Sequence, residues 1–402
     1  MNHSPFLTKL HVEQFRSLRN VTVTFDNPLF LVGKNGSGKS NFVDALAFLS
    51  ECMQRPLSMV FQERGGVYAL CSRGMLPHSD IPRYLKLRAD IQLPGSKRGH
   101  YAFFLDTTTD AGLNVIQEQC LITQRGERVA WFNRDGKRKF FTSVEGFRPR
   151  FDAQSLAMPI MGGLEEFAQV FKALSSIRVY AFAPDRIRQT IEPDSGQDLK
   201  RDGSNVASVL LRHFDRDKNY LTRVRELLAP IVPGITAVLP ILQNNRIDLI
   251  LSQEVNAGKA AQLDFHISEM SDGTIYALAL IVASMQEPAP SLIAIEEPDA
   301  MIHPGALDAI AEKIALAARR GQVVVTTHSP DLLDTKWIEA KHLRFVEWEN
   351  GSTQISPLGD LSVRTIKQHL MGAGELLRAN ALDAAPISAQ EDTGTLFEEM
   401  TA

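Results

Sequence analysis

One stretch of the sequence combines glycines, a lysine and a serine at a spacing that can bind phosphate. Gly33, Gly38, Lys39 and Ser40 follow the pattern G-x-x-x-x-G-K-S, between an apolar run and a segment with helical periodicity. Such a loop points backbone N–H groups at phosphate oxygens, while the lysine reaches the β- and γ-phosphates and the serine hydroxyl ligates Mg²⁺. The sequence therefore predicts a nucleoside-triphosphate site formed by Gly33, Asn35, Gly36, Ser37, Gly38, Lys39, Ser40 and Asn41.

Two more groups of candidate residues follow directly after predicted buried strands. Glu296 and Glu297 come after the apolar run 291–295, and His328 comes after the apolar run 323–327. Adjacent carboxylates can divide the work of phosphoryl transfer, because one can hold Mg²⁺ while the other polarises the attacking water. We expect Glu296 to hold the metal, Glu297 to polarise the water and His328 to donate a hydrogen bond to the γ-phosphate. The alternatives are a solvated acidic turn and a structural histidine.

A second candidate anion site precedes the apolar segment 274–285. Ser271, Asp272 and Gly273 offer a hydroxyl and a glycine N–H at a predicted helix N-terminus, a combination that can bind an anion. Because one γ-phosphate cannot readily occupy two helix N-termini of one subunit, we predict that this site serves the nucleotide of a second subunit. The alternative is an ordinary helix N-cap.

The order of the predicted elements shows how these residues could be positioned. Strands alternate with helices, which favours a mostly parallel sheet with helices on its faces and a ligand at the carboxyl ends of the strands. The phosphate-binding loop, the glutamate pair and His328 each follow a strand, so we expect all three along one sheet edge. Short strands also precede the loop, and helices are predicted over 164–176 and 205–229. The predicted fold is α/β, with antiparallel strands at the N-terminus.

Four segments are predicted along the chain. Residues 1–54 hold the N-terminal strands and the phosphate-binding loop, and residues 55–163 form an inserted β-rich lobe. Residues 164–378 hold the remaining motifs, with a helical and hairpin insertion over about 200–260. Residues 379–402 contain five acids and no base, so we expect a flexible tail. No heptad repeat is sustained, and therefore no long coiled coil is expected.

Composition disfavours several other classes of protein. The formal charge of −4 gives no global basic field for nucleic acid, although the basic clusters 137–139 and 148–150 leave a local patch open. Solvated loops explain these clusters better. Three scattered cysteines, Cys52, Cys71 and Cys120, fit neither a disulfide framework nor a zinc site. No apolar run approaches the ~20 residues that span a bilayer, and no secretion signal begins the chain, so a cytoplasmic location is expected.

The phosphate-binding loop, the Ser271 segment, the glutamate pair and His328 follow one another along the chain in an order that resembles the ABC-type ATPase heads of the RecF/SMC-like group. The resemblance is strongest to the stand-alone bacterial AAA-family ATPases with a RecF-like head. Walker A matches 33–40, Walker B matches 292–297, and His328 within Thr-Thr-His-Ser-Pro matches the switch histidine. Residues 271–274 are similar to the S-D-G-T signature of this group rather than the S-G-G-Q of transporters.

Weaker matches and departures accompany these motifs. Arg16 and Ser17 resemble the F-R-S segment that lies near the adenine in such heads, and Asp185 ends a segment similar to their F-x-P-D, which makes it a candidate nucleotide sensor. Glu296 stands where many relatives have aspartate, which re-aims the metal ligand. His303 stands where transporters carry the D-loop aspartate, as in RecF-like and overcoming-lysogenisation-defect (OLD) type ATPases.

The resemblance implies Mg²⁺-dependent ATP binding and hydrolysis by a homodimer that sandwiches two ATP molecules, and a higher oligomer is compatible with it. ATP would close the pair and hydrolysis would release it. Relatives act in DNA maintenance and anti-phage defence, so we expect such a role with a separate effector such as a nuclease, and direct DNA binding stays open. The alternative is a regulatory or scaffold ATPase that holds a protein partner without nucleic acid. A transporter or other membrane role is disfavoured.

Overall fold

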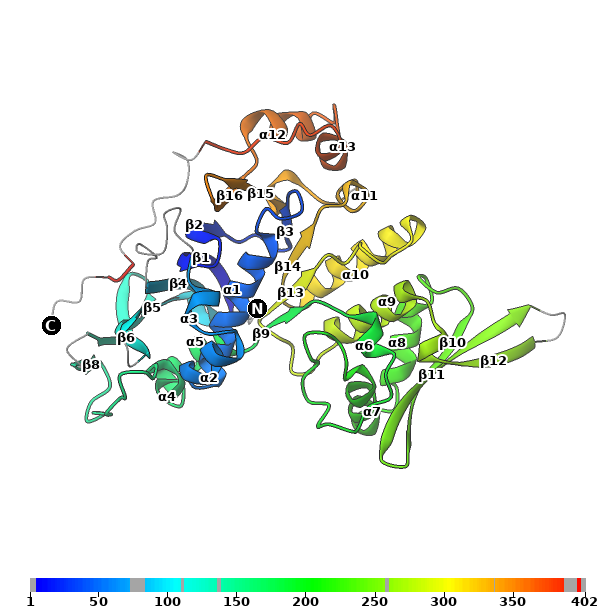
Figure 1. Cartoon of the computed structure of the whole chain (residues 1–402), viewed down its shortest axis with the longest axis horizontal. Coiled ribbons are helices and arrows are strands. Elements are labelled where there is room, and N and C mark those ends of the chain that lie inside the picture. Colours follow the sequence, from blue (N-terminus) through cyan, green and yellow to red (C-terminus); the bar gives the residue numbers. More distant parts are fainter. Residues whose placement is uncertain are drawn as a thin grey trace. The chain divides into compact units, whose positions relative to one another are not determined.

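The computed structural model in Figure 1 describes residues 5–72, 84–109, 112–135, 139–256, 260–335, 337–386 and 396–398. The chain forms two compact units. Unit 1 comprises Met1–Ile177, Ala340–Leu370 and Ala381–Ala402, and unit 2 comprises Arg178–Glu339 and Met371–Asn380. Each unit is therefore built from segments that are distant in sequence.

The larger sheet of unit 1 has seven antiparallel strands in the order β2-β1-β4-β5-β6-β7-β8. They are β1 (Phe6–Phe15), β2 (Leu18–Thr24), β4 (Tyr84–Leu93), β5 (Lys97–Thr109), β6 (Gly112–Gln124), β7 (Glu127–Arg134) and β8 (Phe140–Thr142). Burial alternates strictly along β4, so its apolar side chains face the core and its polar ones face the opposite side. The predicted β-rich segment thus continues the sheet that β1 and β2 begin.

A second sheet of unit 1 carries the phosphate-binding loop. In it, the fully buried strand β3 (Leu29–Val32) pairs in parallel with β15 (Leu343–Glu349), which pairs antiparallel with β16 (Ser352–Pro357). Helix α1 (Lys39–Gln54) follows the loop and packs against α2 (Leu57–Glu63), α4 (Met158–Met161) and α5 (Glu165–Ser175). The remaining helices are α3 (Val67–Leu70), α12 (Asp360–Lys367), η1 (Pro94–Ser96) and η4 (Ala340–His342).

Unit 2 contains the parallel pair β13 (Leu292–Glu296) and β14 (Gln322–Thr327), and β9 (Ile177–Tyr180) lies beside β13. Helix α10 (Leu307–Arg320) connects β13 to β14, which is the crossover that parallel strands require. Helix α9 (Asp272–Ser284) is buried from Thr274 to Ala283 and packs against α7, α8 and α10. Its sequence is apolar all round because every face of the helix is covered.

The rest of unit 2 consists of a three-stranded meander and short helices. The strands are β10 (Ile235–Gln243), β11 (Arg246–Asn256) and β12 (Ala260–His266), and the helices are α6 (Pro184–Ile187), α7 (Val206–Arg216), α8 (Tyr220–Leu228), η2 (Ile267–Glu269), η3 (Pro304–Ala306), α11 (Pro330–Leu333) and α13 (Ala373–Arg378). Asn244 and Asn245 turn the β10–β11 hairpin with φ of 50° and 59°. Asparagine tolerates this left-handed region, and the hairpin predicted around Asn244 and Asn245 is present in the structure.

The helical periodicity predicted over 205–229 is shared by two helices, because the chain breaks between α7 and α8. Asp217 leaves the helix, its carboxylate accepts a hydrogen bond from Asn219 N–H at 2.9 Å, and its carbonyl accepts one from Tyr220 N–H at 3.0 Å. Aspartate offers the backbone such local alternatives to helical pairing. The apolar spacing continues on both sides of Asp217 and therefore hides the break.

The predicted flexible tail includes two described pieces that make specific contacts. Ala384 bridges to Leu358, and the Asp383 carboxylate accepts a hydrogen bond from Ser362 N–H at 2.9 Å. Residues 396–398 contact the seven-stranded sheet through Gln119 and Arg88. The other tail residues, 387–395 and 399–402, lie outside the described residues, as do Lys137 and Arg138 of the first basic cluster.

The helices described in the structure are short. The longest, α1, has 16 residues, so no long coiled coil is present in the described part of the chain. None of the described helices combines the length and apolar character needed to cross a bilayer.

Candidate active site

The phosphate-binding loop forms a tight cradle in unit 1. Gly36 and Gly38 have φ of 79° and 103°, in the left-handed region that favours glycine. A Cβ atom on Gly33 would lie 2.0 Å from Val346 O, and one on Gly38 would lie 1.9 Å from Thr353 Oγ1. Glycine is therefore required at both positions, because strands β15 and β16 pack directly against the loop. Residues 34–36, at the tip of the loop, are exposed.

Two buried side chains of the loop fit a bound phosphate. Lys39 is 4% exposed, and its Nζ donates to Gly33 O at 2.8 Å and to Lys34 O at 3.0 Å. The buried Ser37 hydroxyl has no hydrogen-bond partner among the described residues. Such an orphaned group costs free energy, which a phosphate oxygen would recover by accepting its hydrogen. Ser40 is exposed at the start of α1, where its hydroxyl can meet a metal ion.

A chain of hydroxyl and amide groups holds the loop in place. Asn41 Nδ2 donates to Ser17 Oγ at 2.6 Å, and Ser17 Oγ lies 2.7 Å from Thr353 Oγ1. Thr353 Oγ1 also lies 3.0 Å from Ser37 O, to which it donates, and its N–H donates to Ser17 O at 2.9 Å. Sequence reasoning missed Thr353, because β16 carries no motif and lies far along the chain from the loop. Ser17 and Asn41 are thereby tied to the loop's own backbone.

We expect Thr353→Val to loosen this loop. Valine keeps the volume at a position that is 0% exposed, but it leaves the Ser17 hydroxyl and the Ser37 carbonyl with one partner fewer. Losing buried partners costs roughly 1–3 kcal/mol of unfolding free energy. Chemical denaturation measures this loss, and Thr365→Val in α12 makes the same exchange at a half-exposed position as a control. Unchanged stability in Thr353→Val would show that the network does not support the loop.

Arg16 lies against helix α1 rather than in open solvent. Its backbone has φ of 50°, and its N–H donates to Leu70 O at 2.6 Å. Its guanidinium pairs with Asp44, at 2.9 Å between NH2 and Oδ2, and Asp44 also binds Arg64 at 2.8 Å. Asp44 therefore holds Arg16 beside the helix that follows the loop, and contact of Arg16 with an adenine stays a prediction.

In unit 2, Glu297 and His328 meet at the carboxyl ends of the neighbouring strands β13 and β14. Glu297 has φ of 45°, unusual for a non-glycine residue, and its N–H donates to Thr326 O at 3.0 Å and to Thr326 Oγ1 at 3.1 Å. These bonds hold the strained turn, which places Glu297 Oε1 3.3 Å from His328 Nδ1. At this distance a ring N–H donates to the carboxylate. The structure thus brings together two residues that the strand ends alone predicted to be neighbours.

Two residues near the glutamate pair, Arg201 and Asp299, were not predicted from the sequence as part of this site. Arg201 NH2 lies 2.7 Å from Glu296 Oε1, and Thr327 Oγ1 donates to Asp299 Oδ1 at 2.9 Å. Burial raises the pKa of the Asp299 carboxyl above its ordinary value. Asp299 could have been found from the sequence, because it directly follows the glutamate pair and a proline. Arg201 could not, because it lies in no motif.

The two metal ligands predicted from the sequence, Ser40 and Glu296, belong to different units of the chain. Within the described residues, no group of three or more His, Cys, Asp or Glu side chains could hold a metal ion. Arg201 already neutralises the Glu296 carboxylate. Mg²⁺ usually takes one or two protein oxygens and completes its shell with water and substrate phosphates, so the Glu296 carboxylate of unit 2 and the Ser40 hydroxyl of unit 1 each stay a predicted ligand.

Ser271 caps helix α9 and also lines a cavity in unit 2. Its hydroxyl accepts from Thr274 N–H at 3.3 Å, which is the N-cap contact expected by the plainer interpretation. The cavity has a volume of about 390 Å³ and is bounded by Ile231, Val232, Ser271–Thr274, Met301–His303 and Ala306. A Cβ on Gly273 would lie 2.9 Å from Met301 O, so glycine allows the two loops to approach. The signature segment and the His303 segment therefore form one surface.

Arg188 links the signature segment to Asp185. Its guanidinium binds the Asp272 carboxylate and the carbonyl of Met270, the latter at 3.0 Å, and it pairs with Asp185 at 3.1 Å. Asp185 is almost fully exposed. The two predicted residues Asp185 and Asp272 thus share one cation, which the sequence placed in no motif. A sensing role for Asp185 stays a prediction.

Comparisons with known proteins identify AAA-type ATPase domains in this chain. A family model described as "AAA ATPase domain" matches residues 6–67, and one described as "AAA domain, putative AbiEii toxin, Type IV TA system" matches residues 168–334. No protein of curated function matches the sequence.

Two solved structures show the fold. One is an Smc head bound to the C-winged helix domain of ScpA, with a TM-score of 0.51 and 16% identity over 87% of this chain and 97% of that chain. The other, from Pyrococcus furiosus, is an Smc head with an extended coiled coil bound to the C-terminal domain of ScpA. Its TM-score is 0.50, with 13% identity over 91% of this chain and 99% of that chain.

Proposed function

We propose that two copies of this chain, which matches AAA-domain family models and has the fold of Smc heads, close around two ATP molecules and that hydrolysis reopens the pair. The observation that carries the proposal is the surface made by Ser271–Thr274 and Met301–His303. It offers a serine hydroxyl and a helix N-terminus in unit 2, whereas the phosphate cradle with Lys39 is complete in unit 1. A chain with two such anion sites suits a nucleotide shared between two subunits.

The residues divide the reaction in the following way. The loop N–H groups, Ser37 and Lys39 hold the phosphates, and Glu297 polarises the attacking water. His328 keeps the Glu297 carboxylate in position through its 3.3 Å contact and donates to the γ-phosphate from its other ring nitrogen when that nitrogen carries a proton. Ser40 and Glu296 would hold Mg²⁺, and the metal supplies charge neutralisation at the β- and γ-phosphates.

The energy of the switch resides in the γ-phosphate. A ligand shifts a conformational equilibrium only by its difference in affinity for the two states. In the proposed pair, the γ-phosphate alone contacts both subunits, because the P-loop of one binds it from one side and the Ser271 segment of the other binds it from the opposite side. Hydrolysis removes that bridging group, so the closed state loses its advantage.

Mixing two inactive variants tests the shared site. Lys39→Met and Ser271→Arg should each abolish ATP hydrolysis, since one removes the phosphate-binding charge and the other fills the signature cavity. In random mixed dimers, half of the pairs would carry one intact site, so the mixture should recover roughly a quarter of the wild-type activity. Ser268→Arg, at an exposed position in η2, is the matched control and should stay active. A mixture of folded variants that recovers nothing would contradict the shared site.

We further propose that the switch serves anti-phage defence or DNA maintenance together with a separate effector such as a nuclease. The support is the family model that matches residues 168–334. Its description names a putative AbiEii toxin of a type IV TA system. ATP-dependent binding of duplex DNA that weakens steeply with salt would favour this role. A scaffold ATPase would instead retain a protein partner on purification and show no salt-sensitive DNA binding.

A further inference from the structure

The polar face of the seven-stranded sheet in unit 1 carries a cavity of about 610 Å³ that the proposed ATPase does not use. Cross-strand pairing places Asp90 opposite both Lys9 and His100, and it places Gln92 opposite Arg98, so these side chains share one face. The cavity is lined by Lys9, Arg88, Asp90, Arg98, His100 and Glu398, among others. Three of these residues are Lys or Arg, so the sheet contributes a net positive charge.

A short segment of the chain's own C-terminus forms part of the wall of this cavity. Gln119 is 1% exposed, and its side-chain amide pairs with the backbone of Glu398 in both directions. Gln119 Nε2 donates to Glu398 O at 3.0 Å, and Glu398 N–H donates to Gln119 Oε1 at 2.8 Å. This reciprocal pair holds the backbone of one residue as a neighbouring strand would hold it, and it does not depend on the side chain of that residue.

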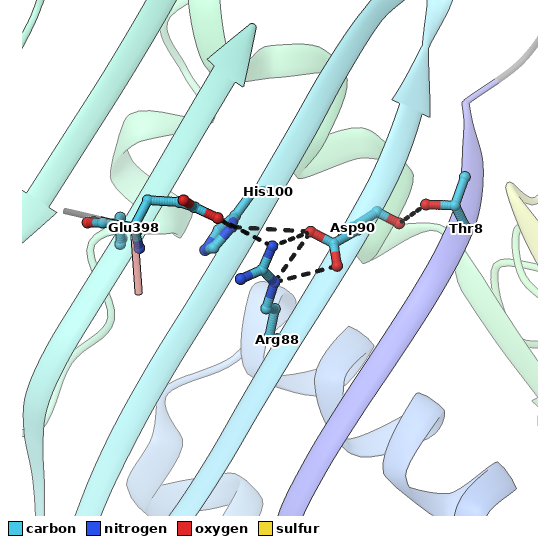
Figure 2. A network of polar contacts seen from close by, with 6 residues as sticks. Thr8, Arg88, Asp90, His100 and Glu398 are labelled. Atoms are coloured by element: carbon cyan, nitrogen blue, oxygen red, sulfur yellow. Dashed lines mark hydrogen bonds and ion pairs between the residues drawn. The ribbon is translucent and has the colours of Figure 1, made fainter. Parts of the chain in front are cut away.

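The Glu398 side chain points at a cation that is already held in place, as Figure 2 shows. Arg88 is bound by Asp90, with 3.1 Å between Nε and Oδ1 and 3.0 Å between NH2 and Oδ1. The same NH2 group lies 3.3 Å from Glu398 Oε1. Because Asp90 fixes the guanidinium, less side-chain entropy is lost when a second carboxylate binds.

His100 completes the pocket and has no hydrogen-bond partner within the described residues. The ring is 6% exposed, and neither of its nitrogens makes a hydrogen bond within the described residues. Its Nδ1 lies 3.8 Å from Glu398 Oε1 and 3.9 Å from Asp90 Oδ1. Burial and the nearby Arg88 lower the pKa of His100 to about 4, so the ring is neutral at pH 7 and can offer an N–H donor to a carboxylate. A small movement of Glu398 would bring its carboxylate within hydrogen-bond distance of the His100 ring.

We propose that this face of the sheet is a recognition site for an acidic peptide segment, and that the chain's own residues 396–398 occupy it beside the open cavity. Gln119 recognises the peptide backbone, whereas Arg88 and His100 recognise a glutamate side chain. The excess of acids over bases in residues 379–402 complements the positive charge of the sheet face. Another acidic peptide can bind this site only by displacing the tail. Because the tail belongs to the same chain, its effective concentration at the site is of the order of 1 mM.

A labelled peptide of residues 391–402 tests the site on the full-length chain. Wild type should bind it weakly, because its own tail competes. Glu398→Lys weakens that competitor, because it loses the carboxylate contacts with Arg88 and His100, and should bind the peptide about tenfold more tightly or better. Adding Arg88→Gln to Glu398→Lys should remove the gain, and a peptide with Glu398→Gln should bind the Glu398→Lys chain about tenfold more weakly than the native peptide does. The last comparison needs no substitution in the sheet, so it does not depend on the folding of a core variant.

Glu312→Lys, on the exposed face of α10, makes the same charge change as a control and should bind the peptide as weakly as wild type. Equal peptide binding by wild type and Glu398→Lys would overturn the proposal, as would equal binding of the native and Glu398→Gln peptides. Salt-sensitive binding of duplex DNA to Glu398→Lys, without peptide binding, would also overturn it, because the face would then be a nucleic-acid surface.

Discussion

A Glu297→Gln variant should bind ATP as wild type does, hydrolyse it at least about 10²-fold more slowly, and remain as a closed dimer. Glutamine keeps the size of the side chain and can still accept a hydrogen bond from His328, so the turn after β13 should persist. It cannot polarise water as a carboxylate does, and the γ-phosphate therefore stays in place. The bridge that closes the pair is then never removed.

Three measurements on the Glu297→Gln variant check these outcomes. Nucleotide titration reports ATP binding, phosphate release reports hydrolysis, and light scattering after chromatography in ATP and Mg²⁺ reports the dimer. Glu312→Gln on α10 is the matched control, because it makes the same exchange at an exposed helix position. A Glu297→Gln chain that releases phosphate at the wild-type rate would remove Glu297 from its role.

A Lys39→Met variant should lose ATP binding by about 10²-fold or more, because two effects act together. The ammonium group supplies charge-assisted hydrogen bonds to phosphate, each worth roughly 1.5–3 kcal/mol. It also donates to Gly33 O and Lys34 O, so its loss leaves the cradle without two of its internal bonds. Methionine keeps the apolar stem of the side chain and is one heavy atom shorter.

Lys34→Met is the matched control, because it removes one positive charge from the same loop at a different position. Lys34 belongs to the same loop, but its side chain is exposed, so its removal should weaken ATP binding only slightly. Titration of nucleotide against both variants gives the comparison, and thermal unfolding shows whether each is folded. Equal affinities of Lys39→Met and wild type would contradict the assigned phosphate contact.

Local pattern was enough to predict the elements whose shape depends on neighbours in sequence. The loop from Gly33 to Ser40 needs glycine at defined spacings, and the hairpin at Asn244 needs residues that tolerate a left-handed backbone. The apolar runs before Glu296 and His328 predicted buried strands, and the order of motifs resembled one ATPase group. In each case the physical requirement lies within a few residues, so a single sequence displays it.

Tertiary structure alone decided the partners that stabilise these sites. Thr353 supports a loop more than 300 residues earlier in the chain, Arg201 neutralises Glu296, and Glu398 reaches the sheet through Gln119. No spacing rule relates such pairs, because each depends on which strands and segments pack together. Even the break at Asp217 was hidden, since apolar periodicity reports which side of a helix is buried and carries no information about competing hydrogen bonds. Chemistry that depends on spacing along the chain was therefore predictable, whereas chemistry that depends on packing was not.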